Sequence, residues 1–530
     1  MTHPRTLAPA LLVPLVVMSA AGAVIGVQLL TSLGVTPNTA LIGALTAMLL
    51  GRVPVRALAV FRSIHAQNLA QSAMSAATFG AANSLLLPIG VPYLLGRPDL
   101  VWPLLSGVAV AMFLDAWLLY RLFGGRVFPA EGAWPPGHAA AEAIRAGDAG
   151  GRHAATLVAS LVAGAAGVWL GLPMSAFGTA FIGNAWALSM FGLGLLASGY
   201  APALAGVSLQ AHFVPHGMMI GAGLVALGQV AVQIARPPQA TRPREAAGGQ
   251  PSAGAAADRR MGATLGAGGA GYLAIATAVA LAAGLAAAMP AWQLATFVVY
   301  AALAAYVHEL IVGLAAMHSG WFPAFAVALI TLLIGMLLGF PPAALGVLTG
   351  LSVATGPAFA DMGYDLKAGF VLRGRGQDAA FEAEGMRQQF LAASVAFAVA
   401  LLVVAFSWQG FFTGGLMPPV ARVYAATIQS GVAPGVAGSL LLWAVPGGLL
   451  QLVGGSRRQL GVLLSTGLLI ANPVAGWGVM AGMAVRLWWE RGLGRPAGGL
   501  DVIAAGFIAG DALLSFGVAM LKDRARGGGA

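Results

Sequence analysis

The sequence contains 530 residues, of which 8% are Asp, Glu, Lys or Arg and 59% are hydrophobic, and its mean hydropathy is +0.84. Because a globular surface must stay hydrated, these values exclude a soluble protein of this size. The net charge of +10 comes from basic residues that stand between apolar runs, which indicates membrane topology rather than a nucleic-acid partner.

Long apolar runs without alternation predict helices that cross a lipid bilayer. The stretch from Ala154 to Ala235 contains no Asp, Glu, Lys or Arg, and each crossing needs about 20 apolar residues. The strands of a barrel would alternate polar and apolar residues, which these runs do not. We expect an all-α polytopic membrane protein, a bundle of about 14 transmembrane helices (12 to 16), some interrupted by Gly or Pro. The run from Leu7 to Leu30 is too long for a signal peptide and is expected to be the first helix.

The first segment that carries functional information is 62–96. Asn68, Gln71 and Ser72 share one helical face, because they are three and four residues apart. Amides can bind a peptide-like or chelate ligand without the desolvation cost of a charge. They can equally hydrogen-bond neighbouring helices and only hold the bundle together. The sequence leaves both alternatives open. Further along the chain, Asp115 is a single carboxyl group inside an apolar run.

The segment 236–262 combines Pro, Gly and five Arg, which predicts a flexible cytoplasmic linker. It divides the chain into an N-terminal transmembrane half, 1–235, and a C-terminal half, 263–530. In each half several apolar runs precede a polar island, at 124–153 and 361–389, and further runs follow. This order suggests the internal duplication that many secondary transporters carry. Basic residues lie an even number of expected spans from the N-terminus, so we expect both termini in the cytoplasm.

The second half adds further titratable groups. His308 and Glu309 are an adjacent base and acid in an apolar run, although neighbours on a helix point in different directions. Asp511 lies in another such run. With Asp115 these residues are the candidates for proton coupling, because buried carboxyl groups and histidines can titrate near neutral pH. Asp361, Asp365 and Lys367 form either a site for a charged substrate or proton, or a solvated loop.

Four motifs together resemble the oligopeptide transporter (OPT) superfamily, which includes the yellow-stripe-like metal-chelate carriers. The first two are Gln-Asn-x-x-Gln-Ser at 67–72 and Pro-Gly-x-Ala-x-x-Glu at 136–142. The most specific is Asp-Leu-Lys-Ala-Gly-Phe at 365–370, with Arg-Gln-Gln downstream at 387–389. Gly-x-x-x-Gly-Asp at 506–511 completes the resemblance.

The resemblance implies a duplicated helical bundle that imports small peptides, or metals bound to amino-acid-like chelators, together with protons. On this basis we expect Asn68, Gln71, Asp365 and Lys367 to contact substrate. Asp511 stands where the family often has Glu, and the Asn-Pro-rich signature of the eukaryotic peptide carriers is absent from the sequence, so a divergent prokaryotic member is expected. The membrane would then be the cytoplasmic one.

An enzyme is the alternative from another class. The sequence has no cysteine and no G-x-S-x-G, Walker or H-E-x-x-H motif, so we expect no metal site, no cofactor and no enzymatic activity. A membrane enzyme acting on a lipid-linked substrate would need an acid–base cluster at one membrane surface, and a transporter for an unrelated small solute also fits the composition. Convergence of Asp115, Glu309 and Asp511 within the membrane would favour a transporter over the enzyme.

Overall fold

The computed structural model describes residues 3–33, 39–235, 253–320, 323–431, 435–470 and 472–527. These residues are helical wherever they have regular structure, apart from an isolated bridge between Phe123 and Phe128. Nine helical segments of the described chain are long and apolar enough to cross a membrane, and three shorter apolar helices accompany them. The prediction of an all-α polytopic membrane protein is therefore confirmed, while the total of about 14 crossings stays a prediction.

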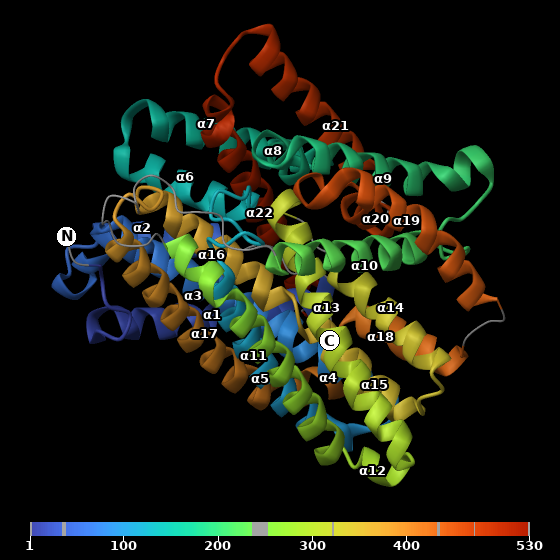
Figure 1. The fold of residues 1–530 in the computed structure, drawn as a ribbon. Coiled ribbons are helices and arrows are strands. Elements are labelled where there is room, and N and C mark those ends of the chain that lie inside the picture. The colour runs from blue at the N-terminus through green and yellow to red at the C-terminus, as the bar shows by residue number, and fades with distance from the viewer. Residues whose placement is uncertain are drawn as a thin grey trace.

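The helices form two packed groups (Figure 1). The first group lies in the lower part of the view and surrounds α16. Its members are α1 (Pro9–Leu33), α2 (Ala40–Arg52), α3 (Ile64–Phe79), α4 (Leu87–Leu94), α5 (Val101–Leu122), α11 (Ala253–Ala282), α12 (Leu285–Ala288), α13 (Ala291–Ser319), α14 (Ala324–Leu337), α15 (Pro342–Ala354), α16 (Pro357–Leu372), α17 (Ala379–Thr413) and α18 (Pro419–Ser430).

The second group lies above the first in Figure 1, and α6 connects the two groups by packing on both α16 and α22. Its members are α6 (Pro135–Ala149), α7 (Gly151–Trp169), α8 (Met174–Ile182), α9 (Ala185–Ala205), α10 (Val214–Ala235), α19 (Val436–Arg458), α20 (Leu460–Ile470), α21 (Pro473–Leu487) and α22 (Asp501–Gly527). Two glycines permit close approach here: a Cβ at Gly221 would lie 1.8 Å from the Ala444 carbonyl oxygen, and one at Gly510 would lie 2.1 Å from that of Leu161.

Each group draws helices from both halves of the sequence. The strongest pairings in the second group join α10 to α19, α7 to α22 and α9 to α20. The two sequence halves therefore interleave in space, and whether they are duplicates stays a prediction. Of the expected linker, 236–252 lies outside the described residues, and 253–262 is the first part of α11.

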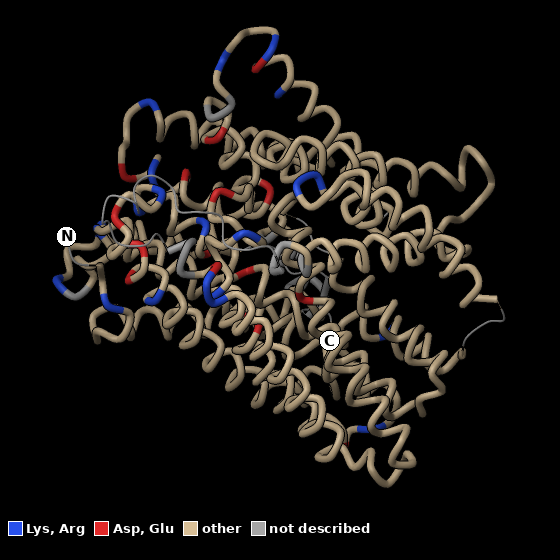
Figure 2. Tube along the Cα trace, viewed as in Figure 1, with Lys and Arg blue, Asp and Glu red and all other residues tan. Residues whose placement is uncertain are grey.

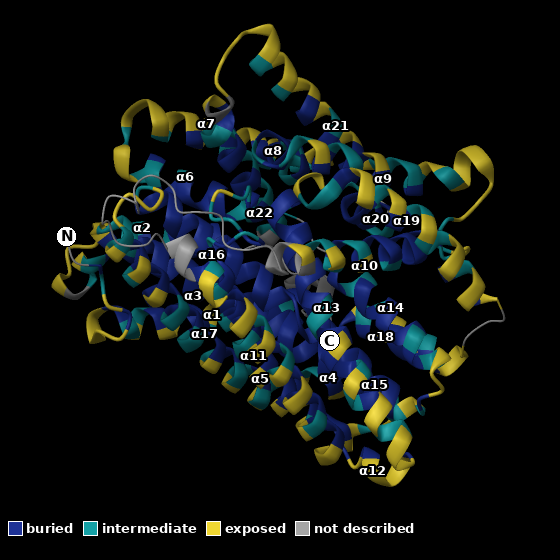
Figure 3. Ribbon diagram, viewed as in Figure 1, coloured by how far each residue is buried: buried dark blue, intermediate teal, exposed yellow. Residues whose placement is uncertain are grey.

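Several helices are interrupted, as predicted. A π-helical turn, η2 (Gly80–Leu86), joins α3 to α4 within one segment from Ile64 to Leu94. Two residues, Thr355 and Gly356, break the segment formed by α15 and α16. Backbone breaks inside a membrane are tolerated where protein covers them or where they line a cavity. Figure 3 shows that α3, α16 and part of α13 are indeed the buried centre of the first group.

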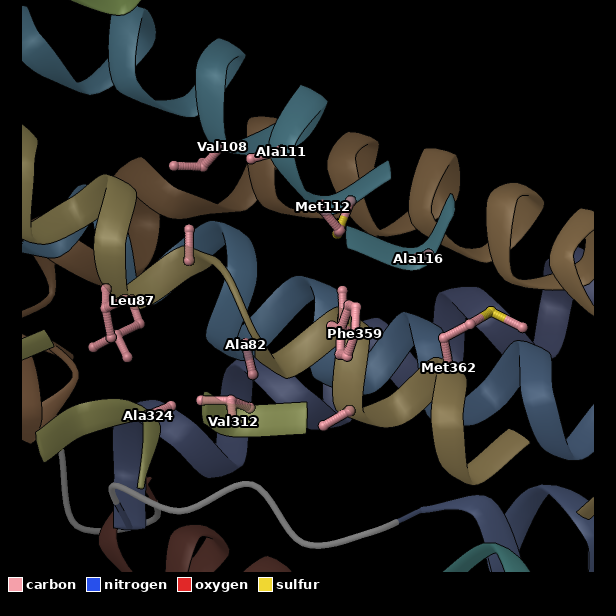
Figure 4. Packing of buried hydrophobic residues seen from close by; sticks show 14 of the residues in the cluster. Ala82, Leu87, Val108, Ala111, Met112, Ala116, Val312, Ala324, Phe359 and Met362 are labelled. Carbon is pink, nitrogen blue, oxygen red and sulfur yellow. The ribbon is translucent and has the colours of Figure 1, made fainter. Parts of the chain in front are cut away.

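The centre of the first group is a continuous apolar cluster. Figure 4 shows part of it, with Met112 of α5, Val312 of α13 and Phe359 of α16 inside one packed interior. Methionine and alanine fill this interior beside the aromatic rings, so the helices lie close together. Polar side chains within this interior are consequently shielded from water and from lipid.

Charged residues gather at one end of the first group, the end at which the described N-terminus lies (Figure 2). The chain segments at this end are tied together by contacts, for example between Thr6 and Gln388 and between Arg126 and Asp258. The arginines of these segments include Arg5, Arg52, Arg56, Arg62, Arg121, Arg126, Arg259, Arg260, Arg373, Arg375 and Arg387. The exposed pair Arg97–Asp99 lies just before the opposite end of α5.

Candidate functional site

Two carboxyl groups meet at one tyrosine hydroxyl in the interior of the first group. Asp115 comes from α5, Tyr272 from α11 and Glu309 from α13, and all three side chains are buried. The Tyr272 hydroxyl donates to Asp115 Oδ1 and lies 2.9 Å from Glu309 Oε2. The residues lie well inside their helices, away from the charged end of the group. The carboxyl groups that the sequence indicated at Asp115 and Glu309 are thus brought together.

The break between α15 and α16 contacts the same carboxyl pair. The backbone N–H of Gly356 donates to Asp115 Oδ2 over 3.1 Å, directly before the first turn of α16. Gly356 has φ +96°, a value that favours glycine. Asp115 therefore lies at the positive end of a helix dipole.

His308 does not join this pair, although it neighbours Glu309 in the sequence. Its Nδ1 bonds to the Ser352 carbonyl oxygen of α15, and the Ser352 hydroxyl donates to Thr331 Oγ1 over 3.1 Å. Adjacent residues on a helix point in different directions, so the base and the acid face different helices. His308 thus contacts the segment α15 while Glu309 contacts α11.

A second pair of carboxyl groups lies further along α16. Asp361 and Asp365 are one helical turn apart and face α3. Gln71 Nε2 donates to Asp365 Oδ1 over 2.5 Å, and the Ser75 hydroxyl donates to Asp361 Oδ1. Asn68 is fully buried on the same face of α3, and neither atom of its amide has a hydrogen-bond partner among the described residues.

The hypothesis of a solvated loop at Asp361, Asp365 and Lys367 is wrong. All three residues are buried in α16, because this helix is covered by α3, α5, α6 and α13. Lys367 Nζ donates to the Ala130 carbonyl oxygen over 2.9 Å. Since Lys367 is two positions from Asp365, the two side chains leave the helix on different faces, and none of the ion pairs among the described residues joins them.

Asp511 lies in the second group, apart from both pairs. Its Oδ2 accepts the backbone N–H of Ser175 over 2.6 Å in the first turn of α8, and its Oδ1 accepts the Ser515 hydroxyl over 3.1 Å. These are the contacts of a residue that caps a helix N-terminus. Of the three carboxyl groups whose convergence would favour a transporter over an enzyme, only Asp115 and Glu309 come together.

The comparisons with known proteins agree with the motifs in the sequence. The sequence pattern of a family described as "OPT oligopeptide transporter protein" matches residues 198–522, more than half of the chain. The chain belongs to the OPT oligopeptide transporter family. A search among curated proteins found no match.

As an OPT family member, the protein is a multi-pass membrane transporter of the oligopeptide-transporter type. The matched residues include Tyr272, Glu309, Asp361, Asp365 and α22 up to residue 522, whereas α3 and α5 lie before them. Each carboxyl pair of this OPT protein therefore includes or contacts a helix outside the matched region, α5 for the first pair and α3 for the second.

Sequence reasoning missed Tyr272 and Gly356. Tyr272 stands in a run of Gly, Ala and aliphatic residues, where a hydroxyl needs a partner, and this isolation is a signal that could have pointed to it. Gly356 stands between Thr355 and Pro357, and this pattern is typical of a break before a new helix. Neither signal indicates which carboxyl group the residue would meet.

Proposed function

We propose that the protein is a proton-coupled importer of small oligopeptides or metal–chelate complexes in the cytoplasmic membrane. The observation that carries the coupling part is the Tyr272 hydroxyl between Asp115 and Glu309. A phenol has one hydrogen and can donate it to one acceptor at a time. Both contacts are therefore hydrogen bonds only when one of the carboxyl groups holds a proton.

The surroundings favour Glu309 as the group that holds this proton. Asp115 accepts from Tyr272 and from the Gly356 N–H, and it lies at the N-terminus of α16. Hydrogen bonds to the charged form and a helix N-terminus both stabilise a carboxylate. Glu309 has Tyr272 as its partner, and its Oε1 has none among the described residues. Neutral Glu309 then donates to the Tyr272 oxygen while Tyr272 donates to the Asp115 carboxylate.

If Glu309 lost its proton, Asp115 and Glu309 would both be negatively charged, and the Tyr272 hydroxyl would have one hydrogen to donate to two acceptors. Two like charges in a buried site repel strongly, because little solvent screens them. The arrangement of Asp115, Tyr272 and Glu309 cannot persist in that state. Since Asp115 also bonds the Gly356 N–H, the change reaches the break between α15 and α16. Proton release is thereby linked to movement of an interrupted helix.

Substrate recognition is assigned to the residues that the sequence indicated on α3 and α16. The buried amide of Asn68 has an unused donor and an unused acceptor within the described structure, which matches the needs of a peptide group. Gln71 and Asp365 already contact each other beside it. Lys367 belongs to the same proposal through the family motif alone. His308 and Asp511 also stay predicted coupling residues, although neither contacts the Asp115–Glu309 pair.

The charged end of the first group supports a proposal for the orientation. Its many arginines favour a cytoplasmic location of that end by the positive-inside rule. The described N-terminal segment lies there as well, because Thr6 bonds Gln388 next to Arg387. We propose a cytoplasmic C-terminus on the basis of the sequence.

The experiment that tests the proposal is uptake into proteoliposomes. A pooled library of short peptides and a set of iron–chelate complexes are offered with and without an inward proton gradient. The wild type should accumulate one class against its concentration gradient only when protons flow inward. Glu309→Gln keeps an amide donor for Tyr272 but cannot exchange a proton, so it should lose accumulation and keep substrate exchange. The exposed Glu131→Gln is the control and should behave as the wild type. Accumulation by Glu309→Gln would refute the coupling role.

A further inference from the structure

The pair Asp361–Asp365 poses a charge problem that the coupling pair does not solve. Both side chains are buried, with exposed fractions of 1% and 0%, and each is fixed by a neutral donor from α3. None of the ion pairs among the described residues includes either carboxyl group. Buried carboxylates without a counter-charge are strongly unfavourable, so a cation is needed to neutralise them.

The charged and titratable groups around α16 are engaged elsewhere. Lys367 donates to the Ala130 carbonyl oxygen, and Arg373 binds Glu382 on α17 with contacts of 2.7 and 3.0 Å. Other groups on α16 and the helices packed against it also have partners elsewhere. Tyr364 donates to the Gly320 carbonyl oxygen, Asp115 accepts from Gly356, and Arg145 donates to the Val371 carbonyl oxygen and pairs with Glu142. His138 pairs with Asp501, His308 bonds the Ser352 carbonyl oxygen, and Glu309 contacts Tyr272. Arg387 pairs with Glu384, and the His65 ring lies against those of His3 and Phe381. None of these groups supplies a positive charge to Asp361 or Asp365 by a hydrogen bond or an ion pair.

Each carboxyl group of this pair keeps one unused oxygen atom. Asp361 Oδ2, Asp365 Oδ2 and Gln71 Oε1 are buried and have no hydrogen-bond partner among the described residues. Gln71 reaches the pair through its amide nitrogen, which donates to Asp365. The Ser75 hydroxyl completes the set, since it bonds Asp361 and keeps a lone pair. Carboxylate, amide and hydroxyl oxygens are hard ligands, which bind a proton or a hard metal cation.

We infer that Asp361 and Asp365, with Gln71 and Ser75, form a second cation site that holds a proton or a sodium ion. This inference deepens the proposed function, on which it rests for the role of the cation in transport. The site lies on α16, the helix whose N-cap residue Gly356 donates to Asp115 of the Asp115–Glu309 pair. Occupation joins α3 to α16 by neutralising the repulsion between the two carboxylates.

Infrared difference spectroscopy on the reconstituted protein tests this inference, because protonated carboxyl groups have a separate C=O absorption. In the wild type, the absorption should fall when the pH is raised without sodium if the ligand is a proton. It should fall when sodium replaces choline at constant pH if the ligand is sodium. Asp361→Asn and Asp365→Asn should each lose this component, whereas the exposed Asp99→Asn should retain it. Equal difference spectra in the wild type and in both buried variants would overturn the assignment.

A further variant covers the case in which the asparagine variants do not fold. Ser75→Ala keeps both carboxyl groups and removes one hydrogen bond, so it should shift the frequency of the component without abolishing it; an unshifted band would contradict the inference. Glu309→Gln should remove a different component. If proton-driven uptake fails while the Asp361–Asp365 component is present, the proposed function is wrong and the cation site stands. If uptake is proton-driven but this component is absent, the second site is wrong.

Discussion

Replacing Tyr272 by Phe tests the hydrogen-bonded bridge with little change in packing. The substitution removes one hydroxyl, which contacts Asp115 and Glu309 in a fully buried position. A hydrogen bond to a charged group contributes about 1.5–3 kcal/mol, and one between neutral groups about 1 kcal/mol. We therefore expect Tyr272→Phe to lower the free energy of unfolding by about 2–4 kcal/mol.

Tyr306→Phe provides the matched control. The Tyr306 ring lies 5.8 Å from the Tyr272 ring, and its hydroxyl donates to the Leu265 carbonyl oxygen over 3.0 Å. The same substitution there removes one bond to a neutral acceptor, so we expect a loss of about 1 kcal/mol. Unfolding of the two variants can be compared in one detergent.

Transport separates a stability effect from a coupling effect. Without the bridge, Asp115 keeps the Gly356 N–H and Glu309 keeps no described partner. Proton exchange at Glu309 then no longer alters the bonds of Asp115. Tyr272→Phe should lose proton-driven accumulation in proteoliposomes, while Tyr306→Phe should retain it. If both variants accumulate substrate equally, the hydroxyl bridge has no part in coupling.

Three more outcomes are expected. Gly356→Ala should cost about 1–3 kcal/mol in stability, since alanine is strained at φ +96°, and a thermal unfolding midpoint equal to that of the wild type would contradict this. Arg373→Met should cost about 3–5 kcal/mol because it leaves Glu382 buried and unpaired, whereas Arg387→Met at an exposed pair should cost at most about 1 kcal/mol. Burial lowers the pKa of His3. The packing of residues 3–8 against the protein should therefore be stable above the ordinary pKa of histidine and weaken as the pH falls through the lowered value. Hydrogen exchange of this segment should show the change in the wild type and not in His3→Gln.

The fold class could be predicted because it depends on composition alone. Long uncharged runs can only be accommodated in lipid as helices, and the breaks at Gly and Pro could be expected from the same runs. The pairing of helices could not be predicted in this way. Asp115 and Tyr272 are 157 positions apart, and the contact between α5 and α11 depends on packing of side chains that are nearly all aliphatic. Judged from the sequence, such aliphatic helix surfaces could pack equally well against many other helices.

The candidate site shows the same division. Asp115 and Glu309 could be selected because each is a carboxyl group isolated in an apolar run, where a charge is costly. Asp361 and Asp365 stand in a segment with Lys367 and Arg373, so local charge density resembled that of a solvated loop. The structure separates these charges by helical phase: the acids face α3, whereas Lys367 faces the Ala130 carbonyl. Local sequence did not specify that α16 is covered by other helices on every side.

Under the proposed mechanism, the position of α16 links the two buried carboxyl pairs in one transport cycle. Its first turn is held to Asp115 through Gly356, and its middle is held to α3 through Asp361 and Asp365. A rigid helix transmits a displacement at one end to the other, because its backbone hydrogen bonds are internal. Under the proposed mechanism, a change of charge at either pair alters the contacts of the same helix. Binding at one pair then affects the other by the same free energy in both directions, which linkage requires. A double variant that neutralises both pairs should therefore behave differently from the sum of its single variants.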